Sequence, residues 1–230
     1  MLVIFDVEGV LVDGELLPEL AKKVDRENEV YELTMKGIKG EIIWEDGLFQ
    51  RLALIRGCLQ QDCIDVANSL PLMNGARALL RILKNEGWKT VAVSGGFSLL
   101  SDRVRDELGL DYAIANEFFF KDGKLDGTSF RVKSNKAEAL TSLLATLQEP
   151  KENIVAVVDG ANDLNLFEIA GKKIAFNAQP IVEHQANYIV KEKNLTDIIP
   201  ILGLNTPSQD YDSQLPTIPK HDPTVRKVST

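Results

Sequence analysis

The segment FDVEGVLVD, residues 5–13, places two carboxylates directly after the apolar run that opens the chain. Asp6 and Glu8 are separated by one residue, so along an extended strand end their side chains leave on the same side. Two such acids can share one substrate, because one can attack as a nucleophile while the other donates and accepts protons. Taken alone, the pair is more often a turn that ends a strand, and only the motifs that follow reverse this interpretation.

Two further acids occur far along the chain in DGAND, residues 159–163. Asp159 and Asp163 follow another apolar run, NIVAVV. If all four acids meet, mutual repulsion raises their pKa values unless a cation lies among them. Oxygen ligands without clustered His or Cys favour a hard divalent ion, so the pattern predicts a Mg²⁺ site.

An anion-binding cradle is predicted from Ser94-Gly95-Gly96 and Lys136. The Ser94 hydroxyl and the free N–H groups of a glycine-rich turn can bind an anion, and the Lys136 ammonium completes the cradle. Cation, carboxylates and cradle together indicate phosphoryl chemistry. Mg²⁺ and Lys136 would offset the repulsion between an attacking carboxylate and phosphoryl oxygens, and the second acid would protonate the departing alkoxide.

Short β-branched runs alternate with helical patterns, which predicts an α/β fold with a Rossmann-like parallel sheet flanked by helices. The predicted strands are residues 2–7, 90–94, 111–115, 153–159, 173–176 and, with a weaker pattern, 187–190. The predicted crossover helices are residues 75–87, 98–109 and 136–147. Asp122-Gly123 predicts a hairpin turn that forms an antiparallel flap. Parallel strands share one carboxyl edge, so Asp6, Ser94 and Asp159 are expected in one crevice there.

Residues 14–72 interrupt the alternation, because they contain amphipathic helical patterns and no convincing strand. A helical insertion directly after the first strand predicts a cap over the carboxyl edge of the sheet, where it would exclude water. The predicted phosphatase core is therefore residues 1–13 and 73–202, with the cap at 14–72. Residues 203–230 are rich in Pro, Ser and Thr without an apolar face, and we expect them to be disordered.

Composition argues against nucleic-acid-binding, membrane-spanning and secreted proteins. The chain has 230 residues, 44% of them hydrophobic, and a net charge of −8, which suits one sizeable core and argues against nucleic-acid binding. No apolar stretch approaches the roughly 20 residues of a membrane span, and no basic and apolar signal segment opens the chain. We therefore expect a cytoplasmic protein, monomeric or homodimeric, that binds no membrane. Cys58 and Cys63 lack nearby His and are predicted to be ordinary thiols.

At this point the motifs resemble those of the haloacid dehalogenase superfamily, and most closely its phosphoserine phosphatase branch. DVEGVLVDGE (6–15), SGGF (94–97), Lys136 in NKAEAL and DGANDLNLF (159–167) occur in the order and spacing of that family, and the resemblance covers roughly residues 1–202. It implies a Mg²⁺-dependent phosphomonoester hydrolase that forms an aspartyl-phosphate, releases L-serine and phosphate from L-phosphoserine, and serves serine biosynthesis. Its substrate is a small phosphorylated metabolite.

The resemblance also implies a role for each matched residue. Asp6 would be the nucleophile and Glu8 the general acid and base. The side chains of Asp6 and Asp159, with the main-chain carbonyl of Glu8, would hold Mg²⁺, and Asp163 would support the waters of the metal. The phosphate would be held by Ser94, Gly95 and Lys136, and Asn162 would contact the substrate.

The cap carries the implied substrate specificity. Glu15 matches the position that faces the substrate ammonium, and Arg51 matches the position that faces its carboxylate, for which a guanidinium is suited by its two parallel hydrogen bonds. A surface salt-bridge role for both residues is the competing interpretation. Trp44 stands where the family suggests Phe and is expected to shield the site or to pack in the cap, and Ile38 replaces an expected Met.

Glu8 departs from the Asp that is usual at the second acid of the first motif, and its side chain reaches one methylene further. Two alternatives to a phosphoserine phosphatase stay open. In the first, the chain is a phosphatase or phosphotransferase for another small phosphorylated metabolite. In the second, it is a non-catalytic phosphate-binding regulator in which Glu8 marks lost chemistry.

Overall fold

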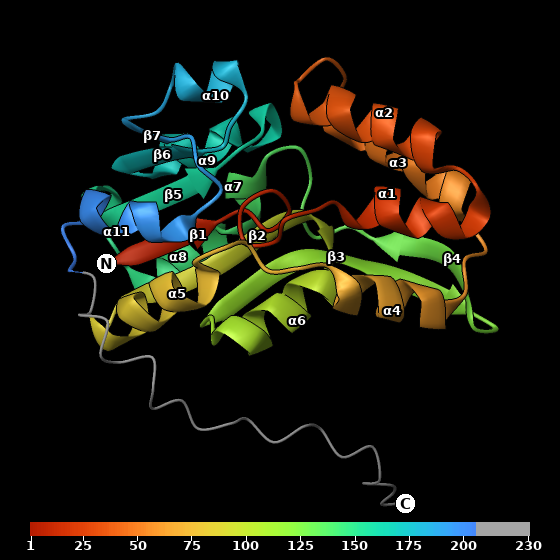
Figure 1. The fold of residues 1–230 in the computed structure, drawn as a ribbon, viewed down its shortest axis with the longest axis horizontal. Helices are drawn as coiled ribbons and strands as arrows, with labels where there is room; N and C mark the ends of the chain where they lie inside the picture. Colours follow the sequence, from red (N-terminus) through yellow and green to blue (C-terminus); the bar gives the residue numbers. More distant parts are fainter. Residues whose placement is uncertain (206–230) are drawn as a thin grey trace, which may run out of the picture.

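The structure is a computed structural model in which residues 1–205 are described, and it is built around one seven-stranded sheet (Figure 1). The strand order is β4-β3-β2-β1-β5-β6-β7, and every neighbouring pair is parallel except β3 and β4. The strands are β1 (Leu2–Phe5), β2 (Lys89–Phe97), β3 (Tyr112–Lys121), β4 (Lys124–Ser129), β5 (Ile154–Val158), β6 (Lys172–Phe176) and β7 (Tyr188–Val190). The predicted α/β class is confirmed. Disorder was predicted for residues 203–230. Residues 206–230 lie outside the described part of the chain, so this stays a prediction.

The central strand β1 sets the position of the predicted site. Phe5, its last residue, lies opposite Ala92 of β2 and Val157 of β5. Asp6 is the next residue, and Ser94 and Asp159 lie two residues beyond those partners. This register brings the three side chains to the same carboxyl edge, as the sequence predicted.

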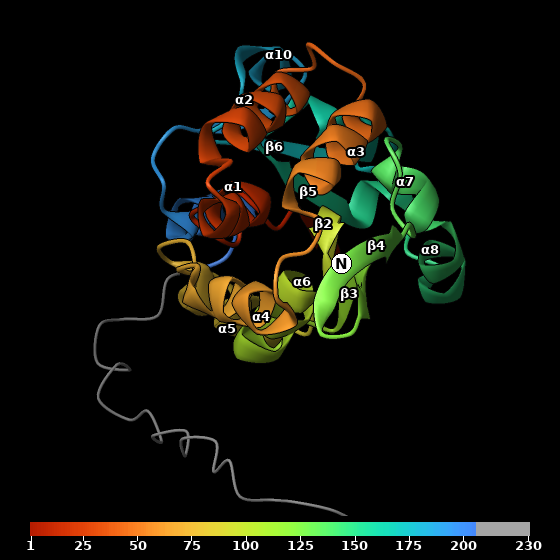
Figure 2. The same ribbon diagram turned by 90° about the vertical axis from the view of Figure 1, so that its right-hand side faces the viewer.

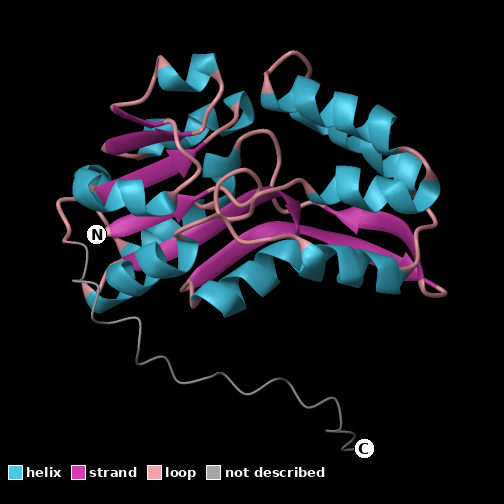
Figure 3. Cartoon of the chain, in the orientation of Figure 1, coloured by secondary structure: helices cyan, strands magenta, loops and turns pink. Residues whose placement is uncertain are grey.

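Helices cover both faces of the sheet, which is why the central strands β1 and β5 are apolar throughout. In β1, Val3 and Phe5 belong to one buried cluster, and Leu2 and Ile4 to the other. The first cluster includes residues of α5, α6 and α11, and the second includes residues of α9 and α10. Figure 3 shows the strands in magenta with helices on either side.

The helices outside the predicted cap are α5 (Ala76–Asn85), α6 (Ser98–Leu108), α7 (Lys136–Ala139), α8 (Thr141–Leu147), α9 (Leu164–Ile169), α10 (Pro180–Glu183) and α11 (Ile198–Ile201). Short 3₁₀ turns occur at η2 (Lys151–Asn153), η3 (Ala161–Asp163) and η4 (Leu195–Asp197). The prediction of a single helix over residues 136–147 is wrong in one respect, because the structure has two helices there, α7 and α8, divided at Leu140. That residue is fully buried, and its backbone (φ −91°, ψ −9°) lies outside the usual helical values.

The predicted hairpin is present, and its strands are longer than expected. Asp122 and Gly123 both have positive φ, 50° and 73°, as a two-residue hairpin turn requires. The strand predicted over 111–115 continues to Lys121 and pairs antiparallel with β4. The turn thus extends the sheet past the carboxyl edge and toward the cap.

The inserted segment is helical, with α1 (Leu16–Ala21), η1 (Lys22–Val24), α2 (Glu27–Ile38), α3 (Trp44–Ile55) and α4 (Gln60–Ser69). Figure 2 shows α2 and α3 together on one side of the sheet edge and α4 on the other, where α4 packs against α6. The amide N–H of Leu125 in β4 donates to the carbonyl of Cys58 between α3 and α4, which ties the flap to the insertion. Within residues 1–205, no helix has the length and apolar composition needed to cross a bilayer.

Candidate active site

The loop after β1 carries the first two acids. The Asp6 N–H donates to the Val157 carbonyl at 3.1 Å, and the side chain of Asp6 is buried. The chain then turns at Gly9, whose φ is +81° and whose missing Cβ would lie 2.2 Å from Oδ2 of Asp159. Only glycine combines this backbone conformation with such a close approach, so Gly9 lets the first loop pack against Asp159.

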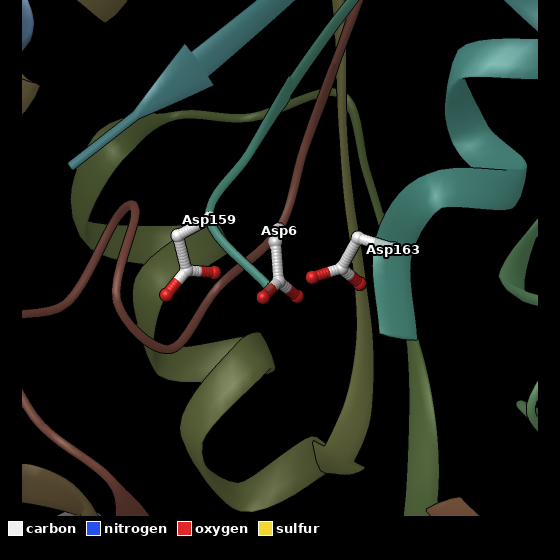
Figure 4. Close-up of side chains that lie close together, drawn as sticks. All are labelled: Asp6, Asp159 and Asp163. Atoms are coloured by element: carbon white, nitrogen blue, oxygen red, sulfur yellow. The ribbon is translucent and has the colours of Figure 1, made fainter. Parts of the chain in front are cut away.

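Three of the predicted acids meet where β1 and β5 end. Asp6, Asp159 and Asp163 each present a carboxylate oxygen within 4.8 Å of the others. In Figure 4 the Asp6 carboxylate lies between the other two. Burial, followed by repulsion from Asp6, raises the pKa of Asp159 well above its usual range and that of Asp163 to about 7.

Lys136, the first residue of α7, is the positive charge of this cluster. It is 3% exposed, and its Nζ donates to Oδ1 of Asp6 at 2.7 Å and pairs with Oδ1 of Asp163. Burial opposes the charge, but the two carboxylates outweigh it and raise the pKa of Lys136. Lys136 therefore stays protonated and holds Asp6 in place.

One ammonium does not neutralise three clustered carboxylates. Oδ2 of Asp163 is buried and has no hydrogen-bond partner among residues 1–205. Hard oxygen ligands that remain unsatisfied at this spacing fit a divalent cation such as Mg²⁺. The donor set therefore fits the metal that the sequence predicted.

Glu8 is accommodated by two features that the sequence analysis did not identify. Its Oε1 accepts a hydrogen bond from the Leu16 N–H at 2.6 Å, and its Oε2 lies against Gly96, where a Cβ would be only 2.2 Å away. Burial is the main cause that raises the pKa of Glu8, the hydrogen bond from the Leu16 N–H opposes the rise, and repulsion from Asp6 adds to it. The site is therefore fitted to the longer side chain, and the carboxyl group is biased toward the protonated form that a general acid needs.

The predicted cradle lies at the end of β2 and differs in one detail from the expectation. The strand continues through SGGF, with a shift of register between Val93 and Phe97. The N–H of Gly96 donates to the Ser94 hydroxyl at 2.9 Å, so it is not free as the sequence analysis assumed. Asn116, fully buried in β3, donates to the Gly95 carbonyl at 2.9 Å and thereby fixes this segment.

These groups surround a small cavity between the sheet edge and the cap. It is lined by Asp6, Glu8, Glu15, Ile38, Trp44, Ser94, Gly95, Gly96, Lys136, Asp159 and Asn162. Its volume is about 20 Å³, which is room for about one water molecule. Most of the predicted site residues therefore meet in one place, and only Asp163 and Arg51 are absent from the lining. Asp163 lies behind Lys136, with which it pairs.

Glu15 and Arg51 are the two predicted contacts with a zwitterionic substrate. Glu15 lines the cavity, and burial together with Glu8 raises its pKa well above the usual range. Arg51 is 2% exposed, donates through Nε to the Gly47 carbonyl and through Nη1 to Thr34, and leaves Nη2 without a partner within the described residues. A surface salt-bridge role is thereby excluded for Arg51, because the side chain is buried.

Asn162 belongs both to this cavity and to a larger cleft. Its Nδ2 donates to Oδ1 of Asp163 at 3.2 Å, and its Oδ1 is buried without a partner in residues 1–205. The cleft, about 510 Å³ in volume, is lined by Gly37, Gly40, Glu41, Ile42, Ile43, Trp44, Ser134, Ala161 and Asn162. Trp44 and Asn162 therefore form the boundary between the cavity and the cleft.

A contact between cap and core was missed from the sequence. Oε1 of Glu45, in the first turn of α3, accepts a hydrogen bond from the Ser134 N–H at 2.8 Å. Asn165 donates to the Ser134 carbonyl at 2.9 Å, which fixes the same residue from the core side. The sequence contains no local signal for Glu45, because its partner is 89 positions away.

Comparisons with known proteins agree with this geometry. A family model described as haloacid dehalogenase-like hydrolase matches residues 1–171. A phosphoserine phosphatase of Methanocaldococcus jannaschii is 34% identical over 201 residues, which cover 86% of this chain and 95% of that relative. A phosphoserine phosphatase of Archaeoglobus fulgidus is 37% identical over 209 residues, covering 88% of this chain but only 60% of the relative.

Solved structures give the same result. A phospho-aspartyl intermediate analogue of phosphoserine phosphatase superposes with a TM-score of 0.84 at 33% identity, over 89% of this chain and 98% of the other. A substrate-bound phosphoserine phosphatase complex also gives a TM-score of 0.84, at 32% identity and with the same coverage. The sheet order, the acid cluster and these similarities lead to one conclusion: the chain belongs to the haloacid dehalogenase-like hydrolase family.

Proposed function

We propose that this protein is a Mg²⁺-dependent phosphoserine phosphatase that works through an aspartyl-phosphate on Asp6. The observation that carries the proposal is the convergence of Asp6, Glu8, Ser94 and Lys136 on one cavity at the carboxyl edge of the sheet. A nucleophile, a proton donor and an anion cradle are the parts that phosphomonoester hydrolysis needs.

Asp6 would attack phosphorus through one carboxylate oxygen. Lys136, 2.7 Å from Oδ1 of Asp6, holds the nucleophile and adds positive charge beside the phosphoryl oxygens. Side chains of Asp6 and Asp159, with the Glu8 carbonyl, would hold Mg²⁺, and Asp163 would support its waters. When bound, the metal supplies charge neutralisation for the phosphoryl group.

Glu8 would move the proton in both halves of the reaction. As the ester P–O bond breaks and the new bond to Asp6 forms, the leaving alkoxide takes the proton of Glu8. Glu8 then accepts a proton from the water that attacks phosphorus, which releases phosphate and restores the Asp6 carboxylate. Its raised pKa supports the first step, and its contact with the Leu16 N–H keeps the carboxyl group oriented.

The cap residues support L-phosphoserine as the substrate. Glu15 lines the cavity as a partner for an ammonium, and Arg51 keeps one nitrogen, Nη2, without a partner among residues 1–205. A buried guanidinium nitrogen of this kind is suited to a carboxylate. The relative from Methanocaldococcus jannaschii and the similar solved structures are themselves phosphoserine phosphatases.

A phosphate-release assay over a substrate panel tests the proposal. We expect turnover of L-phosphoserine in Mg²⁺, none in EDTA, and none with Asp6→Asn. Homoserine added as an acceptor alcohol reveals any phosphotransfer. A negligible rate on phosphoserine, with turnover of another phosphomonoester, would refute the substrate while leaving the chemistry intact.

Arg51→Ala tests the substrate assignment from the side of the protein. We expect KM for phosphoserine to rise far more than KM for phosphoethanolamine, which lacks the carboxylate. Equal increases would show that Arg51 only supports the cap. Beryllofluoride binding in Mg²⁺ completes the test, since a protein that neither binds it nor turns over any substrate is a regulator rather than an enzyme.

A further inference from the structure

Trp44 is held between the cap and the core by two glycines. A Cβ at Gly37 of α2 would lie 2.9 Å from Cε3 of the indole, and a Cβ at Gly95 would lie 2.7 Å from its Nε1. The guanidinium carbon of Arg51 lies 4.5 Å from the ring centroid, a cation–π distance. The ring is therefore fitted into a slot that larger residues at either glycine would close.

The indole N–H has nothing to bond to in this slot. Nε1 of Trp44 is a buried atom without a hydrogen-bond partner anywhere in residues 1–205. An unsatisfied buried donor costs about 1–3 kcal/mol, a cost that an acceptor arriving with a ligand removes. Trp44 lines the cavity together with Ser94, Gly95 and Lys136, so the ligand that this cavity binds can supply the acceptor.

We propose that the indole N–H of Trp44 donates a hydrogen bond to a phosphoryl oxygen of the bound phosphomonoester. Trp44 is then a substrate-binding residue that the cap contributes to the phosphate cradle, where it lines the cavity together with Ser94 and Lys136. The phosphoryl group is the partner, rather than the amino-acid part of the substrate, because Nε1 lies against Gly95 of the cradle. The inference rests on the proposed function in one respect only, which is that the anion bound in the cavity is a phosphoryl group.

The position of Trp44 adds a consequence. Trp44 belongs to the cap and lines both the cavity and the 510 Å³ cleft, whereas Gly95 beside its Nε1 belongs to the core. A hydrogen bond from the indole to the phosphoryl group would therefore form only while the cap lies against the core. A phenylalanine in its place would shield the site but donate nothing. The bond would thus couple phosphate binding to the closed position of the cap, and replacing the indole N–H would remove this coupling.

Inorganic phosphate is the probe, because it binds without turnover. The chain has two tryptophans, Trp44 and Trp88, so Trp88→Phe serves as the control and leaves Trp44 as the single fluorophore. Calorimetric titration in Mg²⁺ is expected to give wild-type affinity for Trp88→Phe and at least tenfold weaker affinity for Trp44→Phe, as for a lost hydrogen bond to a charged acceptor. Affinity within twofold of wild type for Trp44→Phe would overturn the inference.

Two further measurements separate this role from packing. Trp44→Phe should keep the melting temperature of the ligand-free protein and should lower kcat/KM equally for phosphoserine and phosphoethanolamine. A loss confined to phosphoserine would place the N–H on the carboxylate and refute the phosphoryl contact. If Trp44→Phe does not fold, 3-benzothienylalanine at position 44 replaces the N–H by sulfur in a ring of the same size, and the same titration decides.

Failure of the inference is distinguishable from failure of the proposed function. A wild-type protein that binds no phosphate in Mg²⁺ refutes the cradle and with it the phosphatase. A wild-type protein that binds phosphate, with Trp44→Phe binding equally well, refutes only the role of the indole.

Discussion

Lys136→Met tests the electrostatic balance of the site by removing its one buried ammonium. The side chain is 3% exposed and pairs with Asp6 and Asp163, while Asp159 lies in the same cluster. Methionine fills a similar volume without the charge, so the variant leaves two buried carboxylates, Asp6 and Asp163, and the half-buried Asp159 without the ammonium. The matched control is Lys133→Met, which changes an exposed lysine three positions earlier.

The size of the effect follows from the burial of the pair. Removing one partner of a buried ion pair costs about 3–5 kcal/mol, because the remaining charge stays desolvated. In a domain of this size each kcal/mol lowers the melting temperature by about 2–4 °C, so we expect a fall of about 6–20 °C in EDTA at pH 8. The control should change by less than about 0.5 kcal/mol.

The dependence on pH has a definite sign. With Lys136 present, burial already raises the pKa of Asp163 to about 7, above the ordinary value of 3.8, and loss of the lysine raises it further. A carboxyl group whose pKa is higher in the folded protein binds more protons there, so the folded state gains stability as pH falls from above 7 toward 4. The cost of Lys136→Met should therefore be smaller at pH 5.5 than at pH 8.

The assay is thermal unfolding of both variants at pH 8 and pH 5.5, with EDTA or with Mg²⁺. Mg²⁺ should recover much of the loss at pH 8, because it replaces the missing positive charge. A loss of equal size under all four conditions would refute the electrostatic reasoning, since it would show that Lys136 stabilises the fold by packing alone.

Three other predictions concern single side chains. Gly9→Ala should raise the Mg²⁺ concentration for half-maximal activity at least about tenfold, because the added Cβ would lie 2.2 Å from Oδ2 of Asp159. The control is Gly57→Ala, which should leave the metal dependence unchanged, because Gly57 has a similar φ of +88° but open space around it. Glu8→Gln should lower the single-turnover rate of aspartyl-phosphate formation about 10²–10⁴-fold with phosphoserine but far less with p-nitrophenyl phosphate, whose leaving group needs no proton. Equal losses in that first step would contradict the general-acid role, whereas the second step, which also uses Glu8, should slow with both substrates. Cys63 should resist iodoacetamide at pH 8 in the native protein, because burial raises its pKa to about 12, and rapid labelling would show that the cap opens there.

The core could be predicted because its signals are local. Each buried strand is a short apolar run, and the acids at strand ends are the residues that follow it, so the parallel topology alone places Asp6, Ser94 and Asp159 together. The hairpin at Asp122-Gly123 was also readable, since both residues accept positive φ. Where prediction failed, at Leu140, a buried contact outweighed a continuous helical pattern.

The cap was predictable as helices but not as a set of contacts. Amphipathic patterns reveal which face of α2 or α3 is apolar, but not that Glu45 reaches Ser134 or that Arg51 stacks on Trp44. Such pairs depend on how the insertion packs on the core, and no short-range pattern encodes that. The phosphate chemistry and the candidate substrate residues were therefore readable from the motifs, while the contacts that hold the cap on the core required the structure.

Glu8 shows why a motif alone was not sufficient to decide whether chemistry is retained. Seen as a departure from the usual Asp, it left open both a site rebuilt around the longer side chain and a site that had lost its chemistry. In the structure the longer side chain has its own partners, with the Leu16 N–H on one oxygen and space beside Gly96 for the other. A decayed site has no reason to keep a half-buried carboxyl group oriented by a 2.6 Å hydrogen bond, so the substitution is better explained as a rebuilt acid than as a lost one.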